Sequence, residues 1–364
     1  MTHGAAEGNL PCANFPYQQR REGCATYANP LSHFWHRYVV KGYIGYCTSH
    51  YITGWAHRHT GPAIDLTISV NGVPRGSVKP WIERPDVKEL CGLDDPLGFF
   101  FVFPTRLRSG DEVEIRDEFG QPLSAEPITY TVAPLGKSNE LYATRASIAA
   151  SFLRGKGIEI GPYTQPTDLP PDCDVCFYDR MPPADLRATY DYRCGRPLFE
   201  PTVVGDAATL EGINGSKYDF IIANHLIEHL ENPIAFLIAV SSALNSGGCA
   251  MLAAPDKRYS FDHARQITSF SHLLDEHING YAKNRRSHII DVLINIEKRA
   301  EHEIERRISE IEKDSHMIHF HVWDAASFIS FVKQVITTFY LPLSIIYHEE
   351  KNCEIIVVMR KAEV

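Results

Sequence analysis

The chain has 364 residues, of which 44% are hydrophobic and 22% charged, and its formal net charge is −9. These values are typical of a folded globular protein, so they exclude a disordered or fibrous chain. The acidic balance gives no electrostatic reason to expect nucleic acid or an anionic membrane as the main partner. No segment has the roughly 18 consecutive apolar residues that a membrane helix needs, and the start of the chain has no apolar signal core. We therefore predict no membrane span and a cytoplasmic protein whose nine cysteines are reduced.

The first part of the chain predicts a leader followed by β-structure. Residues 1–48 show little periodicity, and we interpret them as an irregular leader. Within residues 49–132, residues 64–70 alternate apolar and polar side chains, and Asn71-Gly72 follows as a strong turn signal. No helical period of useful length appears there, which predicts a small all-β sandwich domain.

A connector over residues 133–154 has helical character and leads into a second domain over residues 155–364. This domain alternates strands and helices, which is typical of an α/β fold with a doubly wound, mostly parallel, seven-stranded Rossmann-like sheet. The predicted strands are residues 156–161, 173–179, 201–206, 218–224, 249–255, 341–350 and 353–361, with a helix over residues 225–244. A charged helical insertion at about residues 262–318 interrupts the pattern. We interpret it as a solvated amphipathic segment, with a lid or a contact between two copies of the chain as the alternative.

Acidic residues end the first three strands of this second domain. Glu159 precedes Gly161, a small residue that lets a cofactor approach the backbone closely. Asp179 comes 20 residues later, at the spacing that suits hydrogen bonds from ribose hydroxyls. Asp206 ends the third strand, where the edge of an adenine could be bound. Three strands that end in acids, in this order, are far more specific than any one of them.

The segment after the fourth strand completes a resemblance. It reads DFIIANHLIEH from Asp219 to His229, and Gly247-Gly248 precedes the fifth strand. With the three acids, this region resembles class I S-adenosylmethionine-dependent methyltransferases of the type 11-like group, over about 200 residues. The resemblance implies methyl transfer with S-adenosylmethionine as the cofactor.

Positions that match the family's motifs imply specific roles in cofactor binding. The amino-acid end of the cofactor would lie against Glu159, Gly161 and Pro162, and the ribose against Asp179 and Arg180. The adenine would lie against Asp206 and Ala207, and the methyl group would lie beside Asn224 and His225. The sequence departs from the family at the glycine loop, because many relatives have G-x-G-x-G where this chain has Pro162-Tyr163. Cofactor contacts beyond Gly161 therefore do not transfer from the family.

A second interpretation of the same segment is a zinc hydrolase. His225-x-x-Glu228-His229 matches the H-x-x-E-H motif of one metallopeptidase group, and residues four apart would share a helix face. His319 and His321 could then be further ligands. The motif follows a strand at the cofactor edge of an α/β sheet, however, so we favour the methyltransferase and assign no metal ligand.

Charged residues after the fifth strand predict the acceptor site, because loops at the carboxyl ends of parallel strands form the ligand crevice. The predicted substrate-binding residues are Asp256, Lys257, Arg258 and Arg265. A hydroxyl acceptor would also lose a proton, and the candidate bases are His225, Asp262 and His263. The alternative is a solvated charged loop without a function.

The β-domain also carries a resemblance. Gly54-Trp55, Asn71-Gly72 and Gly98-Phe99 lie in a segment similar to β-sandwich modules that accompany bacterial glycosyltransferases and methyltransferases of surface-polysaccharide loci. This association implies a glycan, sugar or glycolipid acceptor. The alternative is a glycan-binding or scaffold protein whose methyltransferase domain is inactive.

Overall fold

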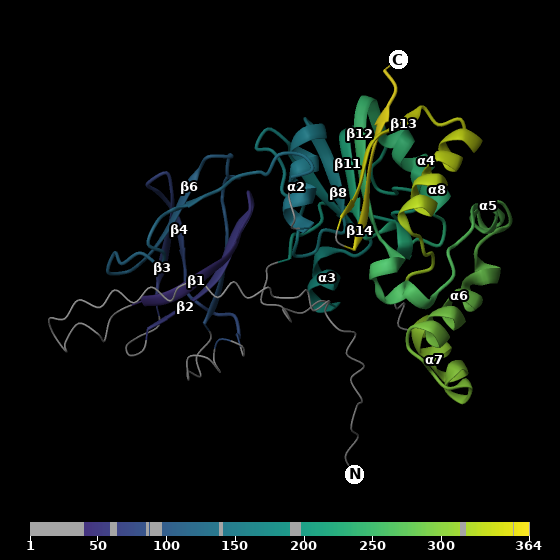
Figure 1. Ribbon diagram of the computed structural model, residues 1–364, viewed down its shortest axis with the longest axis horizontal. Coiled ribbons are helices and arrows are strands. Elements are labelled where there is room, and N and C mark those ends of the chain that lie inside the picture. The colour runs from purple at the N-terminus through teal and green to yellow at the C-terminus, as the bar shows by residue number, and fades with distance from the viewer. Residues whose placement is uncertain are drawn as a thin grey trace, which may run out of the picture.

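The computed structural model describes residues 40–58, 64–84, 87, 97–137, 141–189, 198–313, 318–351 and 353–363. It has a β-domain and an α/β-domain, joined through the helix α2 (Leu141–Phe152) (Figure 1). Within the described residues, no helix is long and apolar enough to cross a membrane.

The β-domain consists of two small antiparallel sheets. Their orders are β1-β2-β5 and β4-β3-β6-β7. The strands are β1 (Val40–Cys47), β2 (Tyr51–Arg58), β3 (Leu66–Val70), β4 (Val73–Val78), β5 (Gly98–Val102), β6 (Glu112–Asp117) and β7 (Ile128–Thr129). Alternating residues of β3 and β6, among them Ile68 and Ile115, join Ile52 and Phe99 from the other sheet in one core. The expected irregular leader is wrong for residues 40–47, which form β1, and the rest of it lies outside the described residues.

The predicted turn in this domain is confirmed. Asn71 and Gly72 both have positive φ, +50° and +75°, between the paired strands β3 and β4. Asn tolerates this left-handed region better than most residues and Gly adopts it freely, which is why the pair favours a tight hairpin.

The α/β-domain contains a seven-stranded sheet with the order β10-β9-β8-β11-β12-β14-β13. The strands are β8 (Lys156–Ile160), β9 (Asp174–Asp179), β10 (Val203–Val204), β11 (Tyr218–Asn224), β12 (Leu244–Pro255), β13 (Leu343–Lys351) and β14 (Glu354–Lys361). The first five are parallel neighbours, while β14 runs antiparallel to both β12 and β13. The carboxyl ends of β8, β9, β10 and β11 therefore meet at one edge of the sheet.

Helices cover both faces of this sheet (Figure 1). Side chains of β11 alternate between the faces: Phe220 and Ile222 pack with α2, whereas Ile221 and Ala223 pack with α4 (Pro233–Ala243) and α8 (Ala325–Thr338). Burial on both faces explains why the central strands read as continuous apolar runs.

The predicted helix over residues 225–244 is too long. Only a short 3₁₀ turn, η2 (Ile227–His229), follows β11, and α4 begins at Pro233. The Asn232 side chain accepts a hydrogen bond from the Ala235 amide, and a proline suits the first turn of a helix, so the helix start has clear local causes. The break expected at residues 245–248 lies within β12, because α4 ends at Ala243.

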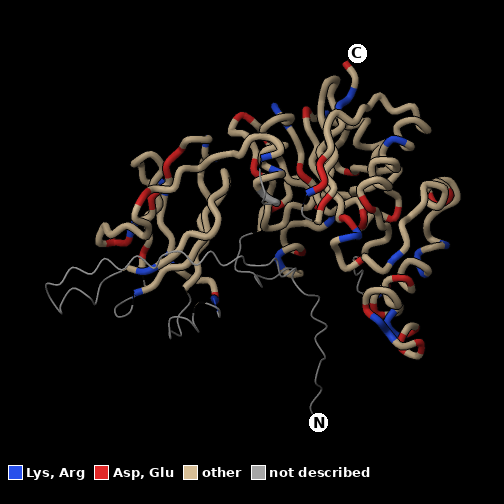
Figure 2. Tube along the Cα trace, viewed as in Figure 1, with Lys and Arg blue, Asp and Glu red and all other residues tan. Residues whose placement is uncertain are grey.

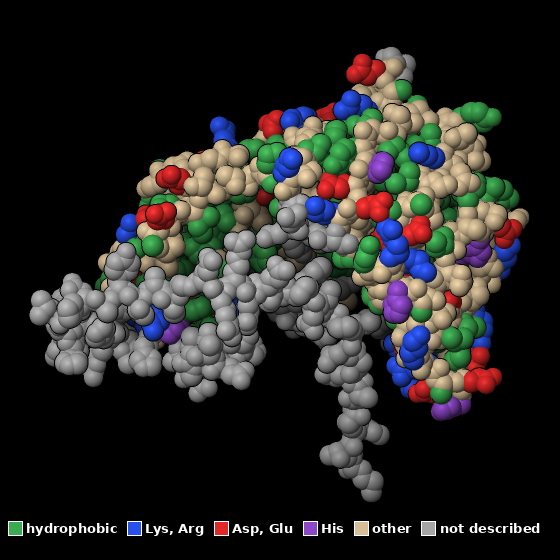
Figure 3. Space-filling model, viewed as in Figure 1, with side chains coloured by type: hydrophobic (Ala, Val, Ile, Leu, Met, Phe, Trp, Pro, Cys, Tyr) green, Lys and Arg blue, Asp and Glu red, His purple; other side chains and the backbone are tan. Residues whose placement is uncertain are grey.

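The predicted helical insertion is present as α5 (Phe270–Asn279), α6 (Ala282–Asn295) and α7 (Glu301–Lys313). Apolar residues of α6 and α7 form a small core of their own with Ile318 and Phe320. Figure 2 shows acidic and basic residues together along α7, where Arg306 and Arg307 pair with Glu310. On the face shown in Figure 3, charges of both signs are interspersed over this domain. That the insertion joins two copies of the chain stays a prediction.

Asp168 ties the two domains together. Its Oδ1 accepts a hydrogen bond from the Ser49 amide at 2.6 Å, and its Oδ2 accepts one from the Tyr130 hydroxyl at 2.7 Å. Arg106 adds a third contact, to the Pro170 carbonyl. The β-domain is thus docked next to the loop that follows β8.

Replacing Tyr130 with Phe is expected to lower the free energy of unfolding by about 1.5–3 kcal/mol, because it removes a hydrogen bond to a carboxylate. Urea denaturation would measure the loss. Tyr340→Phe is the matched control, since Tyr340 is 92% exposed and its change should leave the urea midpoint in place. Equal midpoints for all three proteins would contradict this role for Asp168.

Candidate functional site

Three side chains gather where β8 and β11 end. Glu159 is buried, and its carboxylate accepts hydrogen bonds from the Thr167 amide at 3.0 Å and the Thr167 hydroxyl at 2.7 Å. The Asn224 side-chain amide donates to the same hydroxyl at 2.9 Å. Burial opposes ionisation of Glu159 and raises its pKa to about 7, although the hydrogen bonds from Thr167 work in the opposite direction. Thr167, which the sequence analysis missed, therefore links two predicted cofactor residues.

These residues leave one buried acceptor without a partner. Asn224 Oδ1 has no hydrogen bond, and a buried carbonyl oxygen without a partner costs free energy. Gly161 lies alongside with φ +64°, and no atom lies within 4 Å of the position that a Cβ would take. An unpaired acceptor beside open space at the backbone fits a bound ligand with a donor group, such as an amino group. Pro162 follows and is half-buried.

The ends of β9 and β10 supply the next two acids. Asp179 is buried, and its Oδ1 accepts a hydrogen bond from the Met181 amide at 2.9 Å. Burial raises the pKa of Asp179. Arg180 is exposed beside it. Asp206 is exposed and accepts a hydrogen bond from the Ala208 amide, whereas Ala207 is buried in the core of the domain. Ala207 can therefore offer a ligand little beyond its backbone.

His225 follows β11 in a left-handed conformation with φ +50°, which is uncommon for a residue other than glycine. The Ala253 carbonyl accepts a hydrogen bond from the His225 amide at 2.8 Å. The ring lies between two buried carboxylates: Nε2 hydrogen-bonds to Glu354, and Nδ1 is 3.3 Å from Glu228. Glu354 also pairs with Arg145 of α2. The sequence analysis missed Arg145 and Glu354, which lie 209 residues apart.

The charges of this network decide the state of His225. Burial works against the charged ring, but Glu228 and Glu354 outweigh it and raise the pKa of His225 to about 9. Burial also opposes ionisation of Glu228, but His225 outweighs it and lowers the pKa of Glu228 to about 2. At neutral pH, His225 is therefore an imidazolium that donates hydrogen bonds. This contradicts the expectation that it acts as the base.

The geometric basis of the zinc-hydrolase interpretation is also wrong. His225 is the strand-end residue just described, and His229 ends a three-residue 3₁₀ turn, so the two do not share the face of an α-helix. His229 instead lies edge-on to the ring of His319, and with Glu228 these two offer ligand atoms within 4.8 Å of one another. These three residues could hold a cation, and the set differs from the one that the motif implied.

Most predicted acceptor residues are engaged within the protein. Asp256 is 1% exposed and accepts hydrogen bonds from the backbone and guanidinium of Arg258, which also pairs with Glu350. Lys257, in the 3₁₀ turn η3 (Lys257–Tyr259), is half-buried. Their positions at the end of β12 agree with the prediction, but Asp256 has a structural partner. We infer that Asp256 positions Arg258, and its direct contact with a substrate stays a prediction.

The two candidate bases in the 3₁₀ turn η4 (Phe261–Ala264) differ in burial, since Asp262 is buried and His263 is exposed. Asp262 is 2% exposed and binds both His319 Nδ1 at 2.6 Å and Arg265 at 2.8 Å. Arg265 is equally buried, and it also contacts Asp291. As a base, Asp262 would have to give up its contacts with His319 and Arg265, so its role as a base stays a prediction. His263 is exposed and stays a candidate.

The comparisons with known proteins agree with the site. A family model described as "Methyltransferase domain" matches residues 143–289, which is fewer than half of the 364 residues. These residues are thus similar to methyltransferase domains. The match supports S-adenosylmethionine as the cofactor, as predicted, and the matched range includes every predicted cofactor residue. A search of curated proteins finds no match to the chain.

Several solved structures match this chain at low similarity. A Rhodobacter sphaeroides protein described as a Zn-dependent alcohol dehydrogenase has 13% identity and a TM-score of 0.39, over 63% of this chain and 91% of its own. The N-methyltransferase NodS from Bradyrhizobium japonicum, solved with S-adenosyl-L-homocysteine, has 15% identity and a TM-score of 0.30, over 57% of this chain and 79% of its own. An S-adenosylmethionine-dependent methyltransferase from Methanosarcina mazei has 14% identity and a TM-score of 0.32, over 59% and 96%. TM-scores this low do not support any conclusion about the reaction of this chain.

Proposed function

We propose that this protein methylates a glycan, sugar or glycolipid acceptor in the biosynthesis of a bacterial surface polysaccharide. The observation that carries the proposal is the unpaired Asn224 Oδ1 beside Glu159 and the open backbone of Gly161. This arrangement lies at the carboxyl edge of the parallel strands, where α/β folds bind their ligands.

Each part of the site would hold one part of the cofactor. Glu159 and Asn224 would bind the amino group, Asp179 the ribose hydroxyls, and Asp206 the adenine edge. The cofactor supplies a methyl group on a sulfonium that is already activated, so the protein's task is to position the acceptor and to manage charge. Both ring nitrogens of His225 lie against carboxylates, Glu228 and Glu354, so His225 would hold the end of β11 in place and would not hydrogen-bond to the acceptor.

Removal of a hydroxyl proton needs another group. His229 is the best placed residue, because its Nδ1 hydrogen-bonds to the Ile318 carbonyl at 2.9 Å and Nε2 is then the nitrogen that can accept a proton. It is partly accessible, with 19% of its side chain exposed. We therefore assign proton removal to His229 in place of His225.

Two features support a sugar acceptor. The β-domain resembles modules found beside polysaccharide enzymes, and it presents aromatic side chains to solvent. Tyr43 and Tyr46 of β1 are 59% and 44% exposed, and Trp81 is 44% exposed. Such rings offer an apolar face with a polar edge, which suits the faces of sugar rings.

Calorimetry with S-adenosylmethionine tests the cofactor half of the proposal. We expect the wild type to bind and Asp179→Ala to lose about tenfold or more in affinity, the equivalent of about 1.4 kcal/mol, because the ribose loses a charged acceptor. Asp185→Ala is the control, since Asp185 is exposed on the nearby helix α3 (Pro183–Thr189). Unchanged affinity in Asp179→Ala would refute the ribose assignment, and no heat with the wild type would refute the enzyme.

Labelled S-adenosylmethionine tests the acceptor half. Incubation with nucleotide sugars and polysaccharide fragments should transfer label to at least one of them. Cofactor binding without transfer, together with binding of the same fragments, would favour the alternative of an inactive glycan-binding protein.

A further inference from the structure

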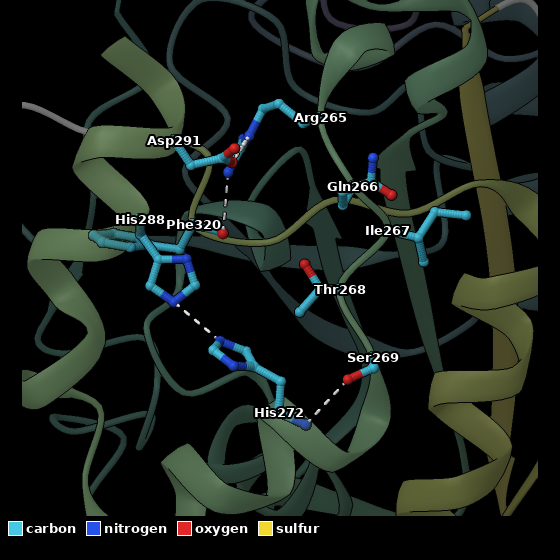
Figure 4. Close-up of a pocket in the computed structure, with 9 residues that line it drawn as sticks. All are labelled: Arg265, Gln266, Ile267, Thr268, Ser269, His272, His288, Asp291 and Phe320. Atoms are coloured by element: carbon cyan, nitrogen blue, oxygen red, sulfur yellow. Dashed lines mark hydrogen bonds and ion pairs between the residues drawn. The ribbon is translucent and has the colours of Figure 1, made fainter. Parts of the chain in front are cut away.

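Three side chains of types that can bind a metal meet in the helical insertion, next to Arg265 and outside the set of predicted cofactor residues. His272 and Glu276 are one turn apart on α5. His288 belongs to α6, and Figure 4 shows its ring facing that of His272. His272 Nε2 lies 3.3 Å from His288 Nε2 and 3.1 Å from Glu276 Oε1, and His288 Nε2 lies 2.8 Å from the same oxygen. The two rings and the carboxylate thus direct their donor atoms at one point.

The size of this triangle suits a small tetrahedral ion. Zinc–nitrogen bonds of about 2.0–2.1 Å place two ligand atoms about 3.3 Å apart at the tetrahedral angle. The three observed edges, 3.3, 3.1 and 2.8 Å, need little adjustment to meet this requirement. Two Nε2 atoms this close cannot both carry a proton toward each other, whereas both can bind the same ion.

A second observation also points to a missing cation. His321 is buried, with 0% of its side chain exposed, and neither ring nitrogen has a hydrogen-bond partner. The second oxygen of Glu276 is also buried without a partner, 3.9 Å from His321 Nε2. Buried polar atoms without partners are costly, and a carboxylate that coordinates an ion is compensated by its charge.

We propose that His272, Glu276 and His288 bind a divalent transition-metal ion, for which Zn²⁺ is the best fit. Imidazole and carboxylate ligands suit zinc, and three protein ligands are typical of sites that keep a fourth position open. His272 and His288 line an open pocket of about 290 Å³, while Glu276 and His321 are buried behind them. The fourth position is therefore reached from the pocket.

The ion would cross-link two helices of the insertion, α5 and α6. α5 contributes two ligands and α6 one, and His321 belongs to the extended segment before α8. Because the ion binds the folded insertion and not the unfolded chain, it should stabilise the protein by mass action.

The test uses the full-length protein, stripped with a chelator and titrated with Zn²⁺. Elemental analysis after desalting should give one equivalent more zinc for the wild type than for His272→Ala/His288→Ala or Glu276→Gln. The unfolding temperature should rise with Zn²⁺ in the wild type and stay constant in these variants. His302→Ala is the matched control, because it removes an exposed histidine from α7 of the same insertion.

Co²⁺ in place of Zn²⁺ reports the ligand geometry through its visible absorption, which should be of the tetrahedral type and absent from the Glu276→Gln variant. Equal zinc content in the wild type and the double variant would overturn the proposal. Zinc that is lost in His319→Ala and kept in the double variant would also overturn it, because that ion would belong to Glu228, His229 and His319. Calorimetry with S-adenosylmethionine verifies that each variant is folded, since the cofactor site lies elsewhere.

Discussion

Replacing Glu354 with Gln is expected to lower the free energy of unfolding by about 3–5 kcal/mol, the usual cost of breaking a buried ion pair. Glu354 is 1% exposed and lies between Arg145 and His225, which are both cationic at neutral pH. The substitution would leave two positive side chains near each other without the carboxylate that they share. Urea denaturation followed by tryptophan fluorescence would measure the loss.

Glu350→Gln is the matched control, because Glu350 is 52% exposed on the same hairpin and pairs with Arg258. An exposed ion pair contributes about 0–1 kcal/mol, so this variant should be close to the wild type. The double variant Arg145→Met/Glu354→Leu should recover part of the stability, since apolar residues can replace a buried pair. If Glu354→Gln is as stable as Glu350→Gln, the network does not hold the site together.

This network explains how distant parts of the chain build one site. Arg145 belongs to the helix that precedes the sheet, Glu354 belongs to the last strand, and His225 directly follows the central strand β11. The antiparallel pairing of β12 and β14 sets Glu354 opposite Pro255, at the same carboxyl edge as His225. The C-terminal hairpin is thus part of the candidate active site as well as of the fold.

The approximate positions of the sheet strands could be predicted because most of them carry a strong local signal. Continuous apolar runs such as residues 218–224, with polar residues at their ends, identify buried parallel strands from the sequence alone. The parallel topology then implies that the polar residues at the ends of those strands lie at the same edge of the sheet. Glu159, Asp179 and Asn224 could be placed in this way, because parallel strands bring their carboxyl ends together.

The partners of these residues could not be predicted from the sequence. Nothing in the sequence near His225 indicates Glu354, since the contact depends on an antiparallel register 129 residues away. The same holds for Asp262, which the fold brings into contact with His319 and Arg265. The short 3₁₀ turn in place of a helix at residues 227–229 likewise depends on tertiary contacts: the Phe320 and His321 amides donate to the Glu228 carbonyl.

Glu159 makes the stability of the cofactor-free protein depend on pH. Burial raises its pKa to about 7, above the ordinary value of 4.5, so the folded state favours the neutral acid. The contribution of Glu159 to the free energy of unfolding is fully present below pH 4.5 and is lost as the pH rises through about 7. A pKa difference of this size corresponds to about 3 kcal/mol. Glu159→Gln, which stays neutral, should lack this contribution to the pH dependence in urea denaturation at pH 5 and pH 8.

Cofactor binding should show the opposite trend, because a cationic amino group binds best to the ionised carboxylate. With a pKa of about 7, roughly one tenth of the Glu159 carboxyl groups are ionised at pH 6, so affinity should rise about tenfold between pH 6 and pH 8. Calorimetry with S-adenosylmethionine at pH 6 and pH 8 measures this change in affinity. Any effect of the cofactor's own titration on the affinity is the same for the wild type and for Glu159→Gln. The variant should bind more weakly at pH 8 and lose the part of the pH dependence that belongs to Glu159. Parallel affinity curves for the wild type and the variant would show that Glu159 does not contact the amino group, and its buried carboxyl would then serve only to hold Thr167 and the loop after β8.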